Sequence, residues 1–292
     1  MNKEDKLILN GHEFTSRFIL GSGKYSLELI KAAVENAGAE ILIVPPAGDD
    51  MQPFMAAFEN AVEQGVAAVI INSPNNPSGA ILSEQTLRVM SKILQAAQEE
   101  KGKSIYLIAD EPYRELVYGD VTVPFVPNIY PNTIVCYSYS KSLSLPGERL
   151  GYIMVPPCVK DSAEVFAAVC GAGRALGYVC APSLMQHMLA QCADVRPDIT
   201  SYAKNRDTLY DALSGMGFDC VKPDGAFYLF VKAPKGDSAG EFCEKAKKFE
   251  ILLVPSDSFG VAGYARLAYC VSEKTAENSL PAFKKLAEEY GL

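Results

Sequence analysis

The chain has 292 residues, of which 49% are hydrophobic and 21% charged, and these values are typical of a globular protein rather than a disordered one. A net charge of −8 argues against a nucleic-acid-binding surface, and no apolar stretch approaches the length of a membrane span. The charged start at residues 1–6 is not a secretory signal, so we expect a cytoplasmic protein without a nucleic-acid or membrane partner.

The cysteine and histidine content limits the chemistry further. The eight cysteines include no Cys-x-x-Cys pair, and His12 and His187 are the only histidines. This content suits neither a zinc site nor a disulfide framework, and it leaves little material for a histidine-dependent triad. We therefore expect no metal, and reduced cysteines that are mostly buried as small apolar residues. The chemistry has to come from lysine and a cofactor.

From residue 48 to residue 156 the sequence alternates helical periodicity with short apolar strands. Such alternation indicates the α/β class, with a mostly parallel sheet and helices on its faces. The predicted helices cover residues 53–64 and 83–100, and the predicted strands cover residues 67–71, 105–109, 133–137 and 151–155.

After Pro156 helical patterns dominate, and residues 196–216 are predicted to form one long helix. Ser272 is a credible N-cap for the last helix, and Gly291 follows the end of that helix. Together the elements of this region predict a second, smaller α+β domain. It comprises strands at residues 226–231, 251–254 and 266–271, and helices at residues 238–249 and 273–290.

The most informative stretch runs from Ser138 to Gly151, with Lys141 just past the apolar strand at residues 133–137. In open α/β sheets, ligands bind at this end of the strands. A lysine amine can form a Schiff base with an aldehyde cofactor, and the Ser138 hydroxyl and the Arg149 guanidinium could hold the phosphate of that cofactor. A serine-rich surface loop with one solvated lysine is the alternative interpretation on composition alone.

This stretch resembles the class I and II aminotransferases, a fold-type I family that depends on pyridoxal phosphate (PLP). Their Ser-x-x-Lys run, followed by Gly-x-Arg-x-Gly, is matched position by position from Ser138 to Gly151. The resemblance implies that Lys141 forms the Schiff base and acts as general base, while Ser138 and Arg149 bind the phosphate of PLP. It also implies an amino acid and a 2-oxo acid as substrates.

Two upstream segments fit the same site in the order that the family uses. The strand at residues 67–71 runs into a turn rich in Asn, Pro and Gly, where the family's Asn-Pro-x-Gly motif implies that Asn76 donates a hydrogen bond to the phenolic oxygen of PLP. The strand at residues 105–109 leads into Asp110, whose carboxylate can pair with a protonated pyridine nitrogen. The resemblance adds Tyr113 as a second partner of the phenolic oxygen. By itself, an aspartate after a strand is more often a cap or turn residue.

A further motif lies near the C-terminus, around Arg266. Arginine presents a planar fork that grips a carboxylate through two parallel hydrogen bonds, and every amino-acid substrate carries an α-carboxylate. The family places such an arginine in an Arg-hydrophobic-small motif, so the resemblance implies that Arg266 binds the substrate together with Asn76. Without these neighbours, a surface ion pair would be the default interpretation. Residues 224–230 and 254–260 also resemble the small-domain sequence of the family.

The start of the chain departs from the family pattern. Residues 7–25, and the following stretch to about residue 44, resemble the N-terminus of thiazole synthase, a barrel enzyme of thiamine biosynthesis. We therefore expect a thiazole-synthase-like segment at residues 1–45, a partial PLP-binding large domain at residues 46–195 and a small domain at residues 196–292. The family's N-terminal arm, its phosphate loop and the aromatic residue that stacks on the pyridine ring are expected to be missing.

One N-terminal feature could partly replace the missing phosphate loop. Residues 19–24 predict a strand and a Gly-Ser-Gly turn before an amphipathic helix, which suits a phosphate on backbone amides, although the thiazole-synthase resemblance explains the same turn. The missing strands are expected to leave unpaired sheet edges and uncovered apolar helix faces.

Three functions stay open at this point. The first is an aminotransferase that acts through a Lys141 Schiff base, and the second is a PLP-dependent lyase on the same scaffold, which would share every residue named above. The third is a noncatalytic remnant that binds PLP weakly or not at all. The resemblance implies a homodimer with sites at the subunit boundary, although the missing segment would remove part of that contact.

Overall fold

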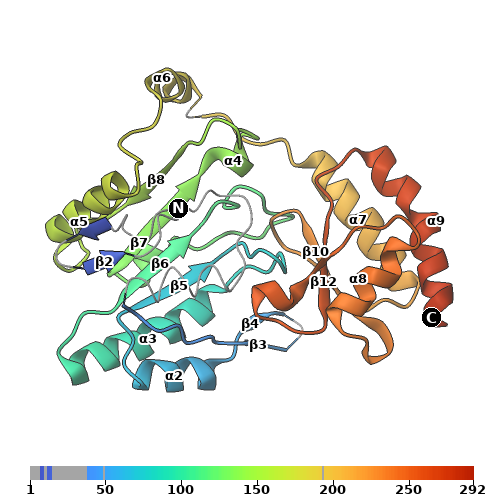
Figure 1. The fold of residues 1–292 in the computed structure, drawn as a ribbon, viewed down its shortest axis with the longest axis horizontal. Helices are drawn as coiled ribbons and strands as arrows, with labels where there is room; N and C mark the ends of the chain where they lie inside the picture. The colour runs from blue at the N-terminus through green and yellow to red at the C-terminus, as the bar shows by residue number, and fades with distance from the viewer. Residues whose placement is uncertain (1–6, 10–11, 15–37, 49, 193) are drawn as a thin grey trace.

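The first part of the fold is built on a four-stranded sheet in the order β5-β6-β7-β8 (Figure 1). The computed structural model describes residues 7–9, 12–14, 38–48, 50–192 and 194–292. Strands β5 (Ala68–Asn72), β6 (Tyr106–Asp110) and β7 (Thr133–Ser138) run parallel, and β8 (Gly151–Met154) is antiparallel to β7. These strands are rich in Val, Ile and Leu, as is usual for a parallel sheet covered by helices. The predicted mostly parallel α/β sheet is confirmed.

Helices α2 (Met55–Glu63) and α3 (Glu84–Lys101) pack against this sheet. Ser83 caps α3 by accepting a hydrogen bond from the Thr86 amide, and Gly102 ends the helix with a φ of 62°. Both helices lie close to the predicted ranges. The core between the helices and the sheet includes Phe58, Val62, Ile71, Leu87, Met90, Leu94, Leu107, Ala109 and Val135.

Two short strand pairs precede α2. Strand β1 (Leu7–Leu9) pairs antiparallel with β2 (His12–Phe14), and β3 (Pro46–Ala47) pairs antiparallel with β4 (Gln52–Pro53). The predicted glycine-rich turn at residues 19–24 lies outside the described residues, as does most of the segment at residues 1–45.

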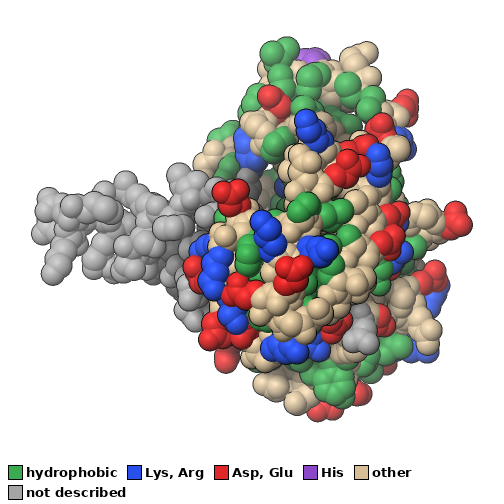
Figure 2. All heavy atoms as spheres, turned by 90° about the vertical axis from the view of Figure 1, so that its right-hand side faces the viewer, with side chains coloured by type: hydrophobic (Ala, Val, Ile, Leu, Met, Phe, Trp, Pro, Cys, Tyr) green, Lys and Arg blue, Asp and Glu red, His purple; other side chains and the backbone are tan. Residues whose placement is uncertain are grey.

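Helices α5 (Ser162–Ala175) and α6 (Ser183–Gln191) follow β8 and contain no buried residue. Phe166 on α5 is 57% exposed, and Leu184 on α6 is 71% exposed. Figure 2 shows hydrophobic side chains gathered at the top of the molecule, where α6 lies in Figure 1. The two helices therefore present apolar side chains to solvent. No helix in the described ranges is both long and apolar enough to cross a membrane.

The second part of the fold is an antiparallel sheet in the order β11-β12-β10-β9 with helices packed against it. Its core includes Leu209, Leu213, Leu229, Phe242, Phe283 and Leu286. The prediction of a smaller α+β domain is confirmed. Its elements are α7 (Thr200–Gly215), β9 (Cys220–Val221), β10 (Tyr228–Lys232), α8 (Ala239–Lys247), β11 (Val254–Pro255), β12 (Tyr264–Ala268) and α9 (Glu273–Tyr290). Short 3-10 turns cover Val126–Asn128, Pro234–Gly236 and Ser256–Phe259.

Some predicted boundaries in this part were wrong. Helix α7 begins at Thr200, after Pro197, and the Asp198 carboxylate accepts a hydrogen bond from the Thr200 amide at the start of the helix. The strand predicted at residues 251–254 is reduced to β11, because Ile251 and Leu253 are buried in the core without strand pairing. The predicted N-cap at Ser272 is confirmed, since its hydroxyl accepts a hydrogen bond from the Thr275 amide.

The expectation that the cysteines are mostly buried was also wrong. All eight thiols are free, and only Cys243 is buried, on the inner face of α8. The reason is that several cysteines lie in the region of α5 and α6, which buries no side chain. The exposed cysteines are Cys158, Cys170, Cys180 and Cys270.

Backbone hydrogen bonds join the two parts of the fold at the entrance to β10. The carbonyl oxygen of Gly79 accepts hydrogen bonds from the amides of Asp224 (3.1 Å) and Gly225 (2.9 Å), and the Ala226 amide donates to Leu116 over 2.8 Å. A Cβ atom on Gly225 would lie 2.7 Å from Pro74 Cβ, so only glycine permits this close approach. The junction places the first residue of β10 beside the turn that follows β5.

Candidate active site

The three sequence motifs converge at one edge of the parallel sheet. Strands β5, β6 and β7 end at Asn72, Asp110 and Ser138, and the register pairs Asn72 with Asp110. The loops that follow these strands carry Asn76, Tyr113 and Lys141. Parallel strands deliver their carboxyl ends to the same side, so residues far apart in sequence meet there. The three motifs therefore lie at the same edge of the sheet.

Asp110 is a largely buried carboxylate that one asparagine orients. Asn72 Nδ2 donates to Asp110 Oδ2 over 2.9 Å and to the Asp110 carbonyl oxygen over 3.1 Å. Burial raises the pKa of the Asp110 carboxyl above its usual range, and the Asn72 hydrogen bond opposes part of that rise. Asp110 forms no ion pair with any residue that the structure describes. A buried carboxylate of this kind is stabilised by a cation placed against it.

Arg266 and Asn76 meet across 190 positions of sequence. Arg266 Nη1 donates to Asn76 Oδ1 over 2.8 Å, and its guanidinium carbon lies over the rings of Tyr228 and Phe259, at 4.5 and 5.0 Å from their centroids. Arg266 Nε is buried and has no hydrogen-bond partner among the described residues. A buried donor without a partner costs about 1–3 kcal/mol, so this arginine is set to receive an acceptor such as a carboxylate.

Lys141 lies in α4 (Tyr139–Ser142), the single turn that follows β7. Its Nζ atom is 5.9 Å from the centroid of the Tyr113 ring and 5.6 Å from that of the Phe227 ring. The ammonium group forms no ion pair with the described part of the chain. Tyr113, Phe227 and Tyr228 contact one another edge to face, with ring centroids 4.8–5.8 Å apart. We call these three rings the aromatic triad, and it supports both Lys141 and Arg266.

Ser138 and Arg149, the two residues predicted to bind phosphate, do not contact each other through a hydrogen bond that the structure describes. Ser138 caps α4: its hydroxyl accepts from the Ser140 amide at 3.2 Å and donates to the Ser140 hydroxyl at 2.8 Å. Arg149 is exposed, has a φ of 56°, and donates from Nη1 to the Pro146 carbonyl oxygen over 2.7 Å. The two residues are close along the β7–β8 pairing, because Ser138 pairs with Gly151. Their polar groups, however, are engaged with separate partners.

Sequence reasoning missed the residues that hold this site together. Asn72 bridges the site, because its Oδ1 accepts the Asn76 amide at 2.7 Å while its Nδ2 binds Asp110. Tyr228 places its hydroxyl 3.0 Å from that of Tyr113. The available signals were the position of Asn72 at a strand end next to the Asn-rich turn, and the aromatic pair Phe227-Tyr228 at the start of a strand.

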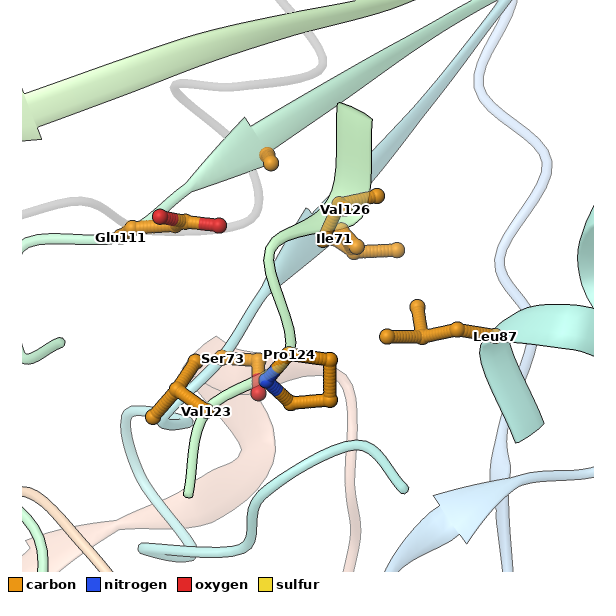
Figure 3. A pocket seen from close by; sticks show the side chains of 8 residues that line it. Ile71, Ser73, Leu87, Glu111, Val123, Pro124 and Val126 are labelled. Carbon is orange, nitrogen blue, oxygen red and sulfur yellow. The ribbon is translucent and has the colours of Figure 1, made fainter. Parts of the chain in front are cut away.

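A small cavity lies behind the site, next to Glu111 (Figure 3). It offers about 10 Å³, roughly the space of one water molecule and far below that of a cofactor. Glu111 Oε2 accepts from Arg114 Nη1 at 2.8 Å, whereas the buried Oε1 has no partner among the described residues. Burial raises the pKa of the Glu111 carboxyl, and Arg114 opposes that rise. The cavity walls are Ile71, Ser73, Leu87, Ala109, Val123, Pro124 and Val126.

Fold and site together define a class. A mixed α/β sheet with an asparagine, an aspartate and a lysine after neighbouring strands, joined to a smaller α+β domain that supplies an arginine, is the architecture of fold-type I PLP-dependent enzymes. The profile of the family described as "Aminotransferase class I and II" matches residues 24–283. The chain therefore belongs to the class I and II aminotransferase family.

Individual relatives agree with this assignment. The chain is 33% identical to a probable aspartate/prephenate aminotransferase of Aquifex aeolicus over 78% of its own length, and 29% identical to aromatic-amino-acid aminotransferase 2 of Thermococcus litoralis over 80%. A crystal structure of an aminotransferase from Eubacterium rectale matches 90% of this chain with 52% identity and a TM-score of 0.86. An aromatic aminotransferase structure from Pyrococcus horikoshii shares the fold, with a TM-score of 0.75.

The matches differ in length from this chain. It spans 59% of the Aquifex protein, 60% of the Thermococcus protein and 66% of the Eubacterium chain. The family match begins at residue 24 and so includes the second half of the segment at residues 1–45, whose resemblance to thiazole synthase is not reproduced by any of these matches.

Proposed function

We propose that this chain is a PLP-dependent aminotransferase that moves an amino group between an amino acid and a 2-oxo acid. The observation that carries the proposal is the convergence of Lys141 and Arg266 on the aromatic triad. Among the described residues, the Lys141 amine has no ion-pair partner, and the buried Nε donor of Arg266 has no hydrogen-bond acceptor. Amino-transfer chemistry requires two groups: an amine that reacts with the cofactor aldehyde, and a guanidinium that binds the substrate carboxylate.

The residues present fit PLP. Asp110 is a half-buried carboxylate without a cation partner among the described residues, and a protonated pyridine nitrogen would supply that cation. Asn76 and Tyr113 would donate to the phenolic oxygen, and Ser138 would bind the phosphate. Arg149 would exchange its bond to Pro146 for the same phosphate.

The chain's own residues would then divide the reaction between them. When bound, PLP supplies an electron-poor ring that accepts the electron pair released at the substrate α-carbon. Lys141 would hold the cofactor at its aldehyde carbon, and after substrate arrives its amine would move a proton between the substrate α-carbon and the C4′ carbon. Arg266 would orient the α-carboxylate, and Asn76, already bonded to Arg266, would align that clamp with the phenolic oxygen.

Homodimerisation is part of the proposal. It is supported by the apolar side chains that α5 and α6 expose, because exposed apolar surface is common at subunit interfaces. Light scattering coupled to gel filtration tests this directly. A mass near twice the monomer's 31.6 kDa supports the dimer, and a monomer at micromolar concentration contradicts it.

The domain division and the cellular location are also proposals. Two hydrophobic clusters support a large domain at residues 46–195 and a small domain at residues 196–292, although the small-domain cluster also includes Tyr113, Leu116 and Tyr118. A thiazole-synthase-like origin of residues 1–45 extends this division, and eight free thiols support a cytoplasmic location. Limited proteolysis should cut near residue 45 and near residue 195, whereas cuts confined to other loops would contradict these boundaries.

The function is tested by titrating the purified protein with PLP and following its visible absorbance, with Lys141→Ala as control. A stoichiometric band that requires Lys141 and changes when an amino acid is added, with release of the matching 2-oxo acid, supports the aminotransferase. Release of ammonia or CO₂ in place of that half-reaction would favour the lyase. A protein without such a band would be the noncatalytic remnant.

A further inference from the structure

Tyr228 occupies a position that touches both ends of the candidate site. It is the first residue of β10, only 6% exposed, and it enters the site directly after the backbone junction at Gly225 and Ala226. Its hydroxyl lies 3.0 Å from the Tyr113 hydroxyl, and its ring lies 4.5 Å from the Arg266 guanidinium carbon. Among the described residues, Tyr228 alone contacts both the Tyr113 hydroxyl and the Arg266 guanidinium in this way.

The hydroxyl groups of Tyr113 and Tyr228 share two hydrogens between them, one on each. Each phenol carries a single hydrogen and can also accept, so a 3.0 Å pair contains one donor and one acceptor. Burial raises the pKa of both phenols, which keeps both neutral at physiological pH. If Tyr113 donates its only hydrogen to the phenolic oxygen of a bound cofactor, then Tyr228 has to donate to Tyr113. A donor that itself accepts a hydrogen bond becomes a stronger donor.

The ring of Tyr228 has a separate task. Arg266 Nη1 donates a hydrogen bond to Asn76, and the guanidinium contacts the rings of Tyr228 and Phe259. An aromatic face attracts a guanidinium and also limits how it can tilt. The Tyr228 ring therefore helps to keep the unused Nε donor of Arg266 in place for an incoming carboxylate.

We propose that Tyr228 is a positioning residue that couples the carboxylate clamp at Arg266 to the phenolic-oxygen donor Tyr113. The hydroxyl acts through Tyr113 on the cofactor, and the ring acts through Arg266 on the substrate. The two functions lie on one side chain, so substrate binding and the electronic state of the cofactor are linked through it. This inference rests on the proposed function, since it requires PLP and an amino acid in the site.

The two functions can be separated by two substitutions. Tyr228→Phe keeps the ring and removes the hydroxyl, whereas Tyr228→Leu removes both. A matched control is Tyr118→Phe: Tyr118 is also buried, also lies under an arginine (4.4 Å from Arg206), and donates its hydroxyl to the Ala226 carbonyl oxygen over 2.5 Å. Loss of that bond tests what the removal of any buried phenol oxygen does to the fold.

The readouts are the pH midpoint of the absorbance change of the bound cofactor and the dissociation constant of a non-reactive dicarboxylate. We expect Tyr228→Phe to raise the midpoint by roughly 0.3–0.7 pH unit, because a weaker donor withdraws less electron density from the phenolic oxygen. Dicarboxylate affinity should change less than about twofold in that variant. Tyr228→Leu should show the same shift and weaken dicarboxylate binding roughly fivefold. Tyr118→Phe should leave both unchanged.

Two different failures can be told apart. If the wild-type protein shows no Lys141-dependent band, both the proposed function and this inference are wrong. If that band is present but Tyr228→Phe has the wild-type midpoint, or shifts it no more than Tyr118→Phe does, the inference alone is overturned. A Tyr228→Leu variant that binds the dicarboxylate as tightly as the wild-type protein would likewise contradict the proposed contribution of the ring to Arg266.

Discussion

Arg266 Nη1 donates a hydrogen bond to Asn76 Oδ1 over 2.8 Å, and this contact joins strand β12 of the antiparallel sheet to the turn after strand β5 of the mostly parallel sheet. The Nε donor of the same guanidinium has no acceptor in the part of the chain that the structure describes. The pair therefore ties a candidate substrate-binding group to a candidate cofactor-binding group. It is the contact on which the proposed arrangement of substrate and cofactor depends.

Replacing Arg266 by lysine should separate substrate binding from cofactor binding. Lysine keeps the positive charge but loses the planar fork, so we expect amino-acid and dicarboxylate affinity to fall roughly tenfold or more while the cofactor band stays. The matched control is Arg206→Lys, since Arg206 also lies over a tyrosine ring, that of Tyr118, in the small-domain core. Loss of the cofactor band together with substrate affinity would refute the role assigned to Arg266.

Asp110→Asn should raise the stability of the cofactor-free protein and lower its affinity for PLP. The substitution removes a buried carboxylate, and we expect the melting temperature of the cofactor-free protein at pH 7 to rise by roughly 2–4 °C, which corresponds to about 1 kcal/mol in a chain of this size. PLP affinity should fall roughly tenfold or more, because the pairing with a protonated ring nitrogen is lost.

The stability that Asp110→Asn adds should depend on pH in one direction only. Burial raises the pKa of the folded Asp110 carboxyl above its unfolded value, so the wild-type protein loses stability as the pH rises through the window between these two values. The advantage of Asp110→Asn should be complete above that window and disappear below it. Thermal melts of both proteins from pH 4 to pH 8 measure this, and an advantage that grows toward low pH would contradict the account.

Asn72→Asp should weaken cofactor binding indirectly, through its effect on Asp110. The substitution places a second carboxylate 2.9 Å from Asp110 Oδ2, where an amide donor now lies, and like charges at that distance oppose ionisation of Asp110. We expect PLP affinity to fall roughly tenfold. Asn75→Asp is the control, because it likewise replaces an amide donor, that of Asn75 Nδ2 to the Asn72 carbonyl oxygen (3.3 Å), while Oδ1 still accepts hydrogen bonds from Ser78. Equal losses in both variants would show that the effect is a general loss of loop structure.

Gly225→Ala should loosen the junction between the two parts of the fold. The added Cβ would lie 2.7 Å from Pro74 Cβ and 3.0 Å from the Leu116 carbonyl oxygen, so the backbone has to move. We expect a loss of roughly 1–3 kcal/mol in unfolding free energy, with weaker amino-acid binding because Tyr228 and Arg266 shift away from Asn76. Gly240→Ala on α8 meets no atom within 4 Å and should be neutral or slightly stabilising in the same urea titration.

Much of the fold was predictable because its periodic patterns are local. The strands that became β5, β6 and β7 and the helix α3 follow from apolar runs and caps within a few residues. The placement of Lys141, Asp110 and Asn76 at one edge of the sheet was predictable for a related reason: each lies at or just after a strand end, and parallel strands bring their carboxyl ends to the same edge.

The remaining features depend on long-range packing. The bridge from Asn72 to Asp110 and the contact of Tyr228 with Tyr113 join residues 38 and 115 positions apart, and no local pattern encodes them. Arg149 follows its motif in sequence, yet in the structure its guanidinium donates to the Pro146 carbonyl oxygen. The exposure of the cysteines near α5 depends on what packs against that helix, which the sequence of the helix does not specify.

Peptide mass mapping after borohydride reduction of the PLP-treated protein tests the central claim most directly. Reduction makes the bond between an amine and the cofactor aldehyde permanent, so the site of attachment can be read from the peptides. The account predicts a single reduced pyridoxyl adduct on Lys141, absent from Lys141→Ala. An adduct spread over surface lysines, or no adduct on the peptide that contains Lys141, would contradict it.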